Sequence, residues 1–455
     1  MKSLSSTTVP NVVNILLVLV FNFIYISARR VPVNDYYGLY EHHQPQFAAA
    51  LEKLEHEPKW VENWPDSSIT MGQVSGVALD SSGLLLVFHR GPNIWGASTF
   101  SDRNVYNGIG EKPIPEPTIL VINDTGELVD KWGQNLFYMP HGITVDTVGN
   151  VWLTDVALHQ VFKFTPDQRD KPAMVLGEKF VPGDDESHFC KPSAVAVLSS
   201  GEFFVADGYC NTRIIKFAPD GTRILQWGKR YGESPFVFKV PHALTLAEDR
   251  GAVCVADRER GRVACFRADN GTYLAAYSSW LIGDRLFSVA YAPVHGGRLY
   301  VVNGPGGGAP VRGYVVDYES GRMVGTFAPD GKFSNPHDIA VTSDGSRVFV
   351  PELDPYRVCK FIDDTPRNAT ESAPPAKPTA NIVLLFGLQR DSLKKVQLSG
   401  SSAVPVGPVS AWGAVSGAMG AALGAVGAAL LALGALALLR ARNRGKEVEA
   451  EPLVQ

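Results

Sequence analysis

The chain has 455 residues, of which 45% are hydrophobic and 19% are charged, and its formal net charge is −4. Acidic and basic residues are interspersed, so the chain lacks the basic face that a nucleic-acid-binding protein needs, and we expect no nucleic-acid partner. The apolar content is sufficient for one large all-β domain of roughly 200–300 residues.

The first 28 residues are typical of a secretory signal peptide. Lys2 precedes an apolar run from about Val12 to Ile26, and small residues near Ala28 offer a cleavage site. A retained signal anchor is the alternative interpretation. Residues 29–69 are predicted to form an N-terminal extension.

Residues 70–365 contain a repeat of about fifty residues. Clear copies are "GNVWLTDVALHQVFKF" (149–164), "GEFFVADGYCNTRIIKF" (201–217) and "GAVCVADRERGRVACF" (251–266), and three weaker copies complete a set of six. Each copy has a strand, a polar turn and a second strand that ends near a phenylalanine. Six short-strand repeats of this period predict a six-bladed, NHL-like β-propeller, whereas a sandwich or a two-domain β protein would not explain the even spacing.

The first strand of each repeat is expected to line the central channel. One equivalent position in these strands alternates between serine and histidine: Ser75, His141, Ser193, His242, Ser288 and His337. A single histidine here would more often be a packed polar residue. Three on alternate blades converge on one point, and three neutral imidazoles with an open fourth position are typical of a catalytic zinc site.

The turn between the second and third strands should lie at the same face as these histidines. This places Arg90, Tyr209 and Arg258 around the mouth of the channel. An arginine there is more often a salt-bridge partner of the aspartate in its blade, and a tyrosine beside a disulfide is more often structural. Two arginines would nevertheless suit an anionic substrate such as a carboxylate, and a tyrosine near zinc and two cations could have a depressed pKa and act as a general base.

The five cysteines and three sequons agree with a secretory compartment. Cys254 and Cys265 flank a predicted hairpin and could form a cross-strand disulfide, Cys190 and Cys210 are the other natural pair, and Cys359 is left over. We expect Cys359 to be buried and reduced, with an intermolecular disulfide as the alternative. The predicted glycosylation sites, in triplets that also occur by chance, are Asn123, Asn270 and Asn368.

The C-terminal region predicts a membrane anchor. Residues 366–410 resemble a Pro/Ser-rich stalk, and residues 411–439 are uncharged over a length sufficient for a transmembrane helix. The basic start of the tail, residues 440–455, predicts a cytoplasmic end. We therefore expect a single-pass type I membrane protein of the secretory granule, Golgi or cell surface.

Several motifs resemble one known family. "VFHRG", "NLFYMPHG", "HFCKPSAVAV", "DGYCNTRI", "VPHALTL", "CVADRERGRVACF" and "PHDIAV" are similar to the lyase module of the peptidylglycine α-amidating monooxygenases, the peptidyl-α-hydroxyglycine α-amidating lyases. The resemblance implies catalytic and substrate-binding roles for Arg90, Tyr209 and Arg258, and the disulfides Cys190–Cys210 and Cys254–Cys265. It also implies zinc on His141, His242 and His337, and a structural calcium on the backbone carbonyls of Val77 and Ile143 and the Asp338 side chain.

The resemblance further implies a reaction, the second step of neuropeptide and hormone amidation. A peptide ending in α-hydroxyglycine would be cleaved to a peptide amide and glyoxylate. About forty residues separate the signal peptide from the propeller, too few for a copper monooxygenase module, so we expect a separate monooxygenase to supply the substrate. The predicted protein is a stand-alone, membrane-anchored monomer. Asn335 departs from the pattern, because vertebrate relatives have methionine there, and this affects the expected shape of the pocket.

Two rival functions remain open at the level of sequence. A non-catalytic NHL-type propeller ectodomain could bind a protein or peptide ligand. A calcium-dependent lactonase-type propeller is a further alternative, but such enzymes use carboxylate and amide ligands in the channel rather than three histidines in register.

Overall fold

The computed structural model describes residues 45–232 and 235–364. The predicted signal peptide, stalk, transmembrane helix, cytoplasmic tail and the sequon at Asn368 lie outside these residues. Within the described ranges, no helix combines the length and the apolar character that a membrane crossing requires.

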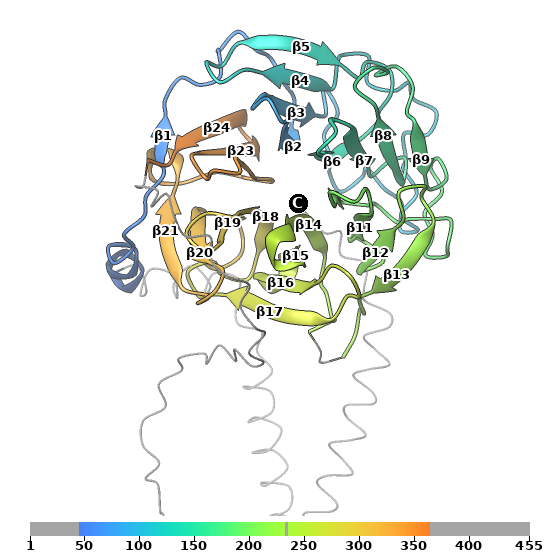
Figure 1. Ribbon diagram of the computed structural model, residues 1–455. Coiled ribbons are helices and arrows are strands. Elements are labelled where there is room, and N and C mark those ends of the chain that lie inside the picture. The colour runs from blue at the N-terminus through green and yellow to red at the C-terminus, as the bar shows by residue number, and fades with distance from the viewer. Residues whose placement is uncertain (1–44, 233–234, 365–455) are drawn as a thin grey trace, which may run out of the picture. The chain divides into compact units, whose positions relative to one another are not determined.

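Six four-stranded antiparallel sheets surround a central channel, as the blades of a propeller (Figure 1). The first blade contains β2 (Val74–Leu79), β3 (Leu85–His89), β4 (Ile119–Ile122) and β5 (Leu128–Trp132). The second contains β6 (Pro140–Val145), β7 (Val151–Asp155), β8 (Gln160–Phe164) and β9 (Met174–Leu176). The third contains β10 (Ala194–Val197), β11 (Phe203–Asp207), β12 (Arg213–Phe217) and β13 (Arg223–Trp227).

The remaining blades follow the same order from the channel outward. The fourth contains β14 (Pro241–Ala247), β15 (Ala252–Asp257), β16 (Arg262–Arg267) and β17 (Tyr273–Ser278). The fifth contains β18 (Leu286–Ala292), β19 (Arg298–Asn303), β20 (Gly313–Asp317) and β21 (Met323–Phe327). The sixth contains β22 (Ala340–Val341), β23 (Arg347–Leu353), β24 (Tyr356–Ile362) and β1 (Lys59–Val61). Residues 45–51 are helical, and short 3-10 turns are η1 (Glu248–Arg250), η2 (Arg258–Arg260) and η3 (Pro329–Gly331). The predicted six-bladed fold is confirmed.

The sixth blade joins the two ends of the ring. Its outermost strand, β1, comes from the N-terminal part of the chain and pairs antiparallel with β24, with Lys59 opposite Ile362. Since β1 lies within residues 29–69, the described propeller begins upstream of the boundary expected at residue 70. Nearby, the buried Trp64 packs on Phe349 of the sixth blade with ring centroids 5.2 Å apart, and its indole N–H donates to the Asp124 carbonyl of the first blade.

Middle strands are buried on both faces, which explains their continuous apolar sequences. All residues of β11 and β15 are buried, whereas the outer strand β13 alternates between partly buried and exposed positions. Aromatic side chains fill the spaces between blades, as where Trp152 of the second blade packs on Phe203 of the third with ring centroids 4.5 Å apart. Neighbouring blades are therefore held at fixed angles around the channel.

The acidic residues that mark the repeat have a structural role. Each lies at or next to the end of the second strand of its blade and accepts hydrogen bonds from the backbone upstream of the first strand. Asp155 accepts from the N–H groups of Tyr138 and Met139, Asp257 from that of Lys239, and Glu352 from that of Asn335. These four bonds fix the chain just upstream of His141, His242 and His337.

Both predicted disulfides are present. Cys190 is bonded to Cys210, and Cys254 is bonded to Cys265, which lies directly opposite it in the β15–β16 ladder. Cys359 is a buried free thiol, as expected. Asn123 is partly exposed and Asn270 is exposed, so both are accessible; their glycosylation stays a prediction.

Candidate active site

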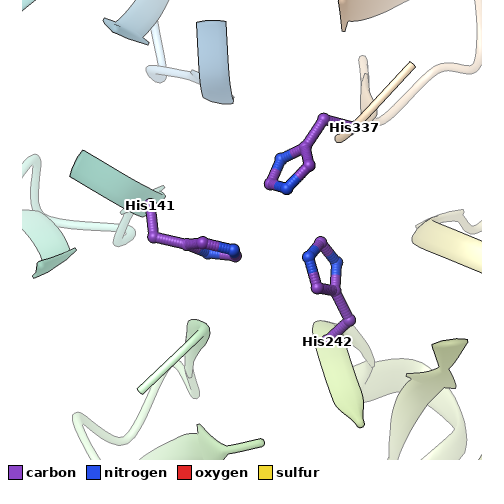
Figure 2. Close-up of side chains that lie close together, drawn as sticks. All are labelled: His141, His242 and His337. Atoms are coloured by element: carbon purple, nitrogen blue, oxygen red, sulfur yellow. The ribbon is translucent and has the colours of Figure 1, made fainter. Parts of the chain in front are cut away.

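The three histidines of the alternating pattern meet in the channel. His141 lies in β6, His242 in β14 and His337 just before β22, and all three are almost fully buried. Their ring centroids are 4.9, 4.9 and 4.6 Å apart, and Figure 2 shows the three rings pointing toward a common centre. The convergence expected from the blade spacing is therefore observed.

A backbone carbonyl orients each imidazole. The Nδ1 atom of His141 lies 2.8 Å from the oxygen of Ser193, that of His242 lies 2.7 Å from the oxygen of Phe287, and that of His337 lies 2.7 Å from the oxygen of Ser75. A carbonyl oxygen can only accept, so each Nδ1 carries the hydrogen and each Nε2 presents a lone pair. In each case the acceptor comes from the next blade, at its serine position for His141 and His337 and at the preceding residue, Phe287, for His242.

The imidazoles are electrically neutral at physiological pH. Burial, opposed by the bond to Ser193 and assisted by Arg90, lowers the pKa of His141 to about 3. Burial and the other nearby imidazoles lower the pKa of His242 and His337 well below the ordinary value. One ligand atom from each ring lies within 4.8 Å of the others, and the buried Nε2 atom of His337 has no hydrogen-bond partner among the described residues. Such a set of neutral nitrogen donors, each held by a carbonyl, fits a zinc ion.

Tyr209 lies directly beside these rings. It follows β11, and its hydroxyl oxygen is 2.8 Å from Nε2 of His141 and 3.0 Å from Nε2 of His242. Arg258 approaches the same oxygen with Nη1 at 3.4 Å and stacks over the phenol ring at 5.2 Å. Burial raises the pKa of Tyr209, and Arg258 and Arg90 only partly offset that effect. The depressed pKa expected from the sequence therefore does not arise from the protein groups, since removing the phenolate from water outweighs the attraction of two cations.

Two buried arginines flank Tyr209. Arg90, fully buried after β3, donates from Nε to the Pro140 carbonyl at 3.0 Å and from Nη1 to the Gln73 side chain at 2.8 Å. Burial lowers the pKa of Arg90 to about 10, so it is charged at neutral pH.

Arg258 belongs to η2 and forms an ion pair with Glu259, with Nε and Oε1 2.9 Å apart. The aspartate of that blade, Asp257, pairs instead with Arg262. Arg258 therefore forms a salt bridge, as the alternative interpretation expected, but its partner is Glu259 rather than the aspartate of its blade.

The residues expected to hold calcium line the same channel. Val77, Ile143 and Asp338 share with the three histidines a cavity of about 280 Å³. The Asp338 carboxylate accepts from the Val77 N–H at 3.0 Å and from the Ser288 hydroxyl at 2.7 Å, and burial raises its pKa to about 6. A half-buried carboxylate in a channel also lined by Val77 and Ile143 could supply one of the oxygen donors that calcium prefers. The contact between Asp338 and Val77 is made through the Val77 N–H.

Three further residues near the site were not found from the sequence. The Trp95 ring lies 4.8 Å from that of Tyr209 and 6.2 Å from that of His141. The Gln73 side chain accepts from both Arg90 and the Trp95 N–H, and Glu259 accepts from both Arg258 and Arg285. Gln73 stands two residues before Ser75, so its place in the repeat could have predicted that it lies near the site. Trp95 lies in residues 92–118, which have no counterpart in the repeat, so the repeat could not predict its position.

Fold and site together define a six-bladed β-propeller with a candidate metal centre in its channel. The NHL repeat family matches residues 189–217. The chain is 47% identical to peptidyl-alpha-hydroxyglycine alpha-amidating lyase 1 of Drosophila melanogaster, over 70% of this chain and 62% of that protein. It is 43% identical to lyase 2 of the same fly, over 67% of this chain and 75% of that protein. The chain belongs to the peptidyl-α-hydroxyglycine α-amidating lyase family.

A longer relative is the peptidyl-glycine alpha-amidating monooxygenase B of Xenopus laevis. It is 46% identical over 66% of this chain, but the matched region is only 35% of that protein. The match therefore spans less than two-thirds of lyase 1 and about a third of the monooxygenase.

Proposed function

We propose that the protein is a zinc-dependent lyase that cleaves a peptide ending in α-hydroxyglycine into a peptide amide and glyoxylate. The observation that carries this proposal is the position of the Tyr209 hydroxyl, within hydrogen-bond distance of two of three converging neutral imidazoles. A hydroxyl that could transfer a proton thus lies beside two of the three candidate metal ligands. Membership of the lyase family supports the choice of reaction.

Zinc would be held by Nε2 of His141, His242 and His337. Once bound, it supplies a Lewis acid that lowers the pKa of a substrate hydroxyl. The Nδ1 bonds to backbone carbonyls keep the three Nε2 lone pairs directed inward. The protein therefore contributes orientation without the cost of rearranging its ligands.

The proposed reaction consumes no water. The substrate R–CO–NH–CH(OH)–COO⁻ loses its hydroxyl proton, the C–N bond breaks, and its electron pair goes to nitrogen, which gains a proton. The products are R–CO–NH₂ and OHC–COO⁻, so atoms and charge balance. One group that accepts a proton and returns it is sufficient, and Tyr209 is the group in position.

The arginines have separate roles in this proposal. Arg258 contacts the Tyr209 hydroxyl and lies over its ring, so its positive charge stabilises the phenolate form. Arg90, fixed by Pro140 and Gln73, would face the substrate carboxylate from the first blade. Both guanidinium groups are buried, which strengthens their attraction for an anion.

Further features of the proposal concern the surroundings of the site. A structural calcium would bind the carbonyls of Val77 and Ile143 and the carboxylate of Asp338. The protein would act in the secretory pathway as a monomeric type I membrane protein, glycosylated at its sequons. A separate copper monooxygenase would supply the α-hydroxylated peptide, and the monooxygenase relative supports this pairing.

Metal analysis of the purified protein tests the proposal against the rival binding propeller. We expect about one tightly bound zinc per chain, in line with a three-histidine site, and its loss in His242→Ala. His295→Ala is the matched control and should retain the zinc, because His295 lies outside the cluster. Protein that folds normally and binds no zinc would favour a non-catalytic propeller that binds a protein or peptide.

A further inference from the structure

A partly buried lysine beside the candidate active site has no counter-ion. Lys191 follows the disulfide-bonded Cys190, and its ammonium group lies 4.3 Å from the centre of the Phe100 ring and 5.9 Å from that of Trp95. No carboxylate in the described ranges forms an ion pair with it, and burial lowers its pKa to about 8. A cation held in such a place without an anion is costly unless a ligand supplies one.

The backbone holds this lysine in an uncommon conformation. Lys191 has a φ of 57°, in the left-handed region that residues other than glycine, asparagine and aspartate rarely adopt. Its N–H donates to Nδ1 of the buried His159 at 3.0 Å, which stabilises this conformation. The ammonium group is thus placed against the two aromatic rings by a specific backbone contact.

Trp95 connects this lysine to the candidate catalytic residues. The Trp95 ring contacts the rings of Tyr209 and His141. The guanidinium carbon of Arg90 lies 5.4 Å from the centre of the same indole. Lys191 contacts the same ring, so one indole separates the lysine from the Tyr209 ring. An extended peptide rises about 3.3–3.6 Å per residue, so one to three residues of substrate span this separation.

We propose that Trp95, Phe100 and Lys191 form a subsite for an acidic side chain one or two residues before the C-terminal hydroxyglycine. The inference rests on the proposed function and adds a substrate class to it. Arg258 contacts Tyr209 directly, and Arg90 is fixed beside it, so these two are better placed than Lys191 for the terminal carboxylate. The rings of Trp95 and Phe100 would pack on the methylene groups of a glutamate while Lys191 binds its carboxylate.

Four peptides test this subsite. They are acetyl-Ala-Glu-α-hydroxyglycine, acetyl-Glu-Ala-α-hydroxyglycine and the two counterparts with glutamine in place of glutamate. For at least one position, we expect kcat/KM of the wild-type protein to favour glutamate over glutamine by about tenfold, the size typical of one charged hydrogen bond. Lys191→Met should abolish this preference while leaving the glutamine peptides nearly unchanged, and Lys191→Arg should retain most of it.

Lys179→Met is the matched control. Lys179 also lies over aromatic rings, 5.3 Å from Tyr138 and 5.0 Å from Phe180, but it does not contact Trp95. This variant should keep the wild-type preference for glutamate. Equal kcat/KM for glutamate and glutamine peptides in the wild type would overturn the subsite. An equal loss on all four peptides in Lys191→Met would also overturn it, because Lys191 would then bind the terminal carboxylate or support the fold.

Equilibrium binding separates failure of the subsite from failure of the proposed reaction. Calorimetry with unreactive analogues that end in glycine should show about tenfold tighter binding of the glutamate analogue, lost in Lys191→Met. If the wild type turns over none of the four peptides, the proposed reaction is wrong, and calorimetry still decides the subsite. Equal affinity for the glutamate and glutamine analogues would contradict it.

Discussion

The Nδ1 atom of His337 lies 2.7 Å from the carbonyl oxygen of Ser75, across the junction between the last and first blades. The third imidazole of the site is therefore oriented by the opposite end of the propeller sequence. Its geometry depends on closure of the ring, which β1 and the contacts around Trp64 provide.

We therefore expect Trp64→Ala to weaken both the fold and the metal centre. Removing a buried tryptophan should lower the free energy of unfolding by about 3–5 kcal/mol, and zinc should be lost to a chelator at a lower concentration. Urea unfolding and zinc retention measure the two effects. Trp280→Ala is the control, since Trp280 is 59% exposed and should change the free energy of unfolding much less. Wild-type stability in Trp64→Ala would show that this contact does not close the ring.

Tyr209→Phe tests the proton-transfer step. The substitution removes only the hydroxyl that contacts His141 and His242, so we expect kcat to fall by about 10²–10⁴-fold with zinc content unchanged. Glyoxylate release and metal analysis of the same sample provide the measurement. Tyr231→Phe alters an exposed tyrosine and should have wild-type kcat. Full turnover by Tyr209→Phe would exclude Tyr209 as the proton acceptor.

Glu259→Gln tests how Arg258 is positioned. The carboxylate of Glu259 holds both Arg258 and Arg285, so loss of its charge should loosen the guanidinium that contacts Tyr209. We expect kcat/KM to fall by about tenfold and the optimum pH of kcat to shift, since the environment of the phenol changes. Glu319→Gln is the control, because Glu319 is an exposed carboxylate that pairs with Arg250. An unaltered pH profile together with unaltered kcat/KM would show that Glu259 does not position Arg258 for the reaction.

Stability should decline in mild acid through His89. This side chain is 4% exposed, its Nδ1 accepts from the N–H groups of Gly72 and Gly91, and burial lowers its pKa to about 4. In the unfolded chain His89 binds a proton near pH 6.5, whereas in the folded protein it does so only near pH 4. The contribution of neutral His89 to the free energy of unfolding is therefore complete above pH 6.5 and is lost between pH 6.5 and 4. One such group changes the free energy of unfolding by up to about 1.4 kcal/mol per pH unit.

His89→Gln isolates that contribution. Glutamine retains an acceptor but does not titrate, so urea unfolding should show a shallower loss of stability between pH 6.5 and 4.5 than in the wild type. Parallel pH profiles for the two proteins would mean that His89 is already protonated in the folded state or that its protonation is not linked to folding.

Much of this architecture could be predicted because the sequence repeats itself. The copies at 149–164, 201–217 and 251–266 predicted the blade period, and the hydrogen bonds of Asp155 and Asp257 explain why an acid recurs in them. The same register predicted the convergence of His141, His242 and His337. The hairpin between Cys254 and Cys265 was local enough to predict their disulfide.

Features without a repeat or a local signal could not be predicted. β1 has only three residues, and its partner β24 lies some three hundred residues away in the sequence, so no pattern links them. Trp95 lies in an insertion unique to the first blade. The burial of Tyr209 was also not visible in the sequence, which reveals the neighbouring charges but not the desolvation that opposes their effect on its pKa.

Release of glyoxylate from a peptide ending in α-hydroxyglycine tests the central claim most directly. Zinc-replete protein incubated with α-hydroxyhippurate should release benzamide and glyoxylate in equal amounts, and a chelator should abolish the release until zinc is restored. Folded, zinc-replete protein that leaves the substrate intact would contradict the account.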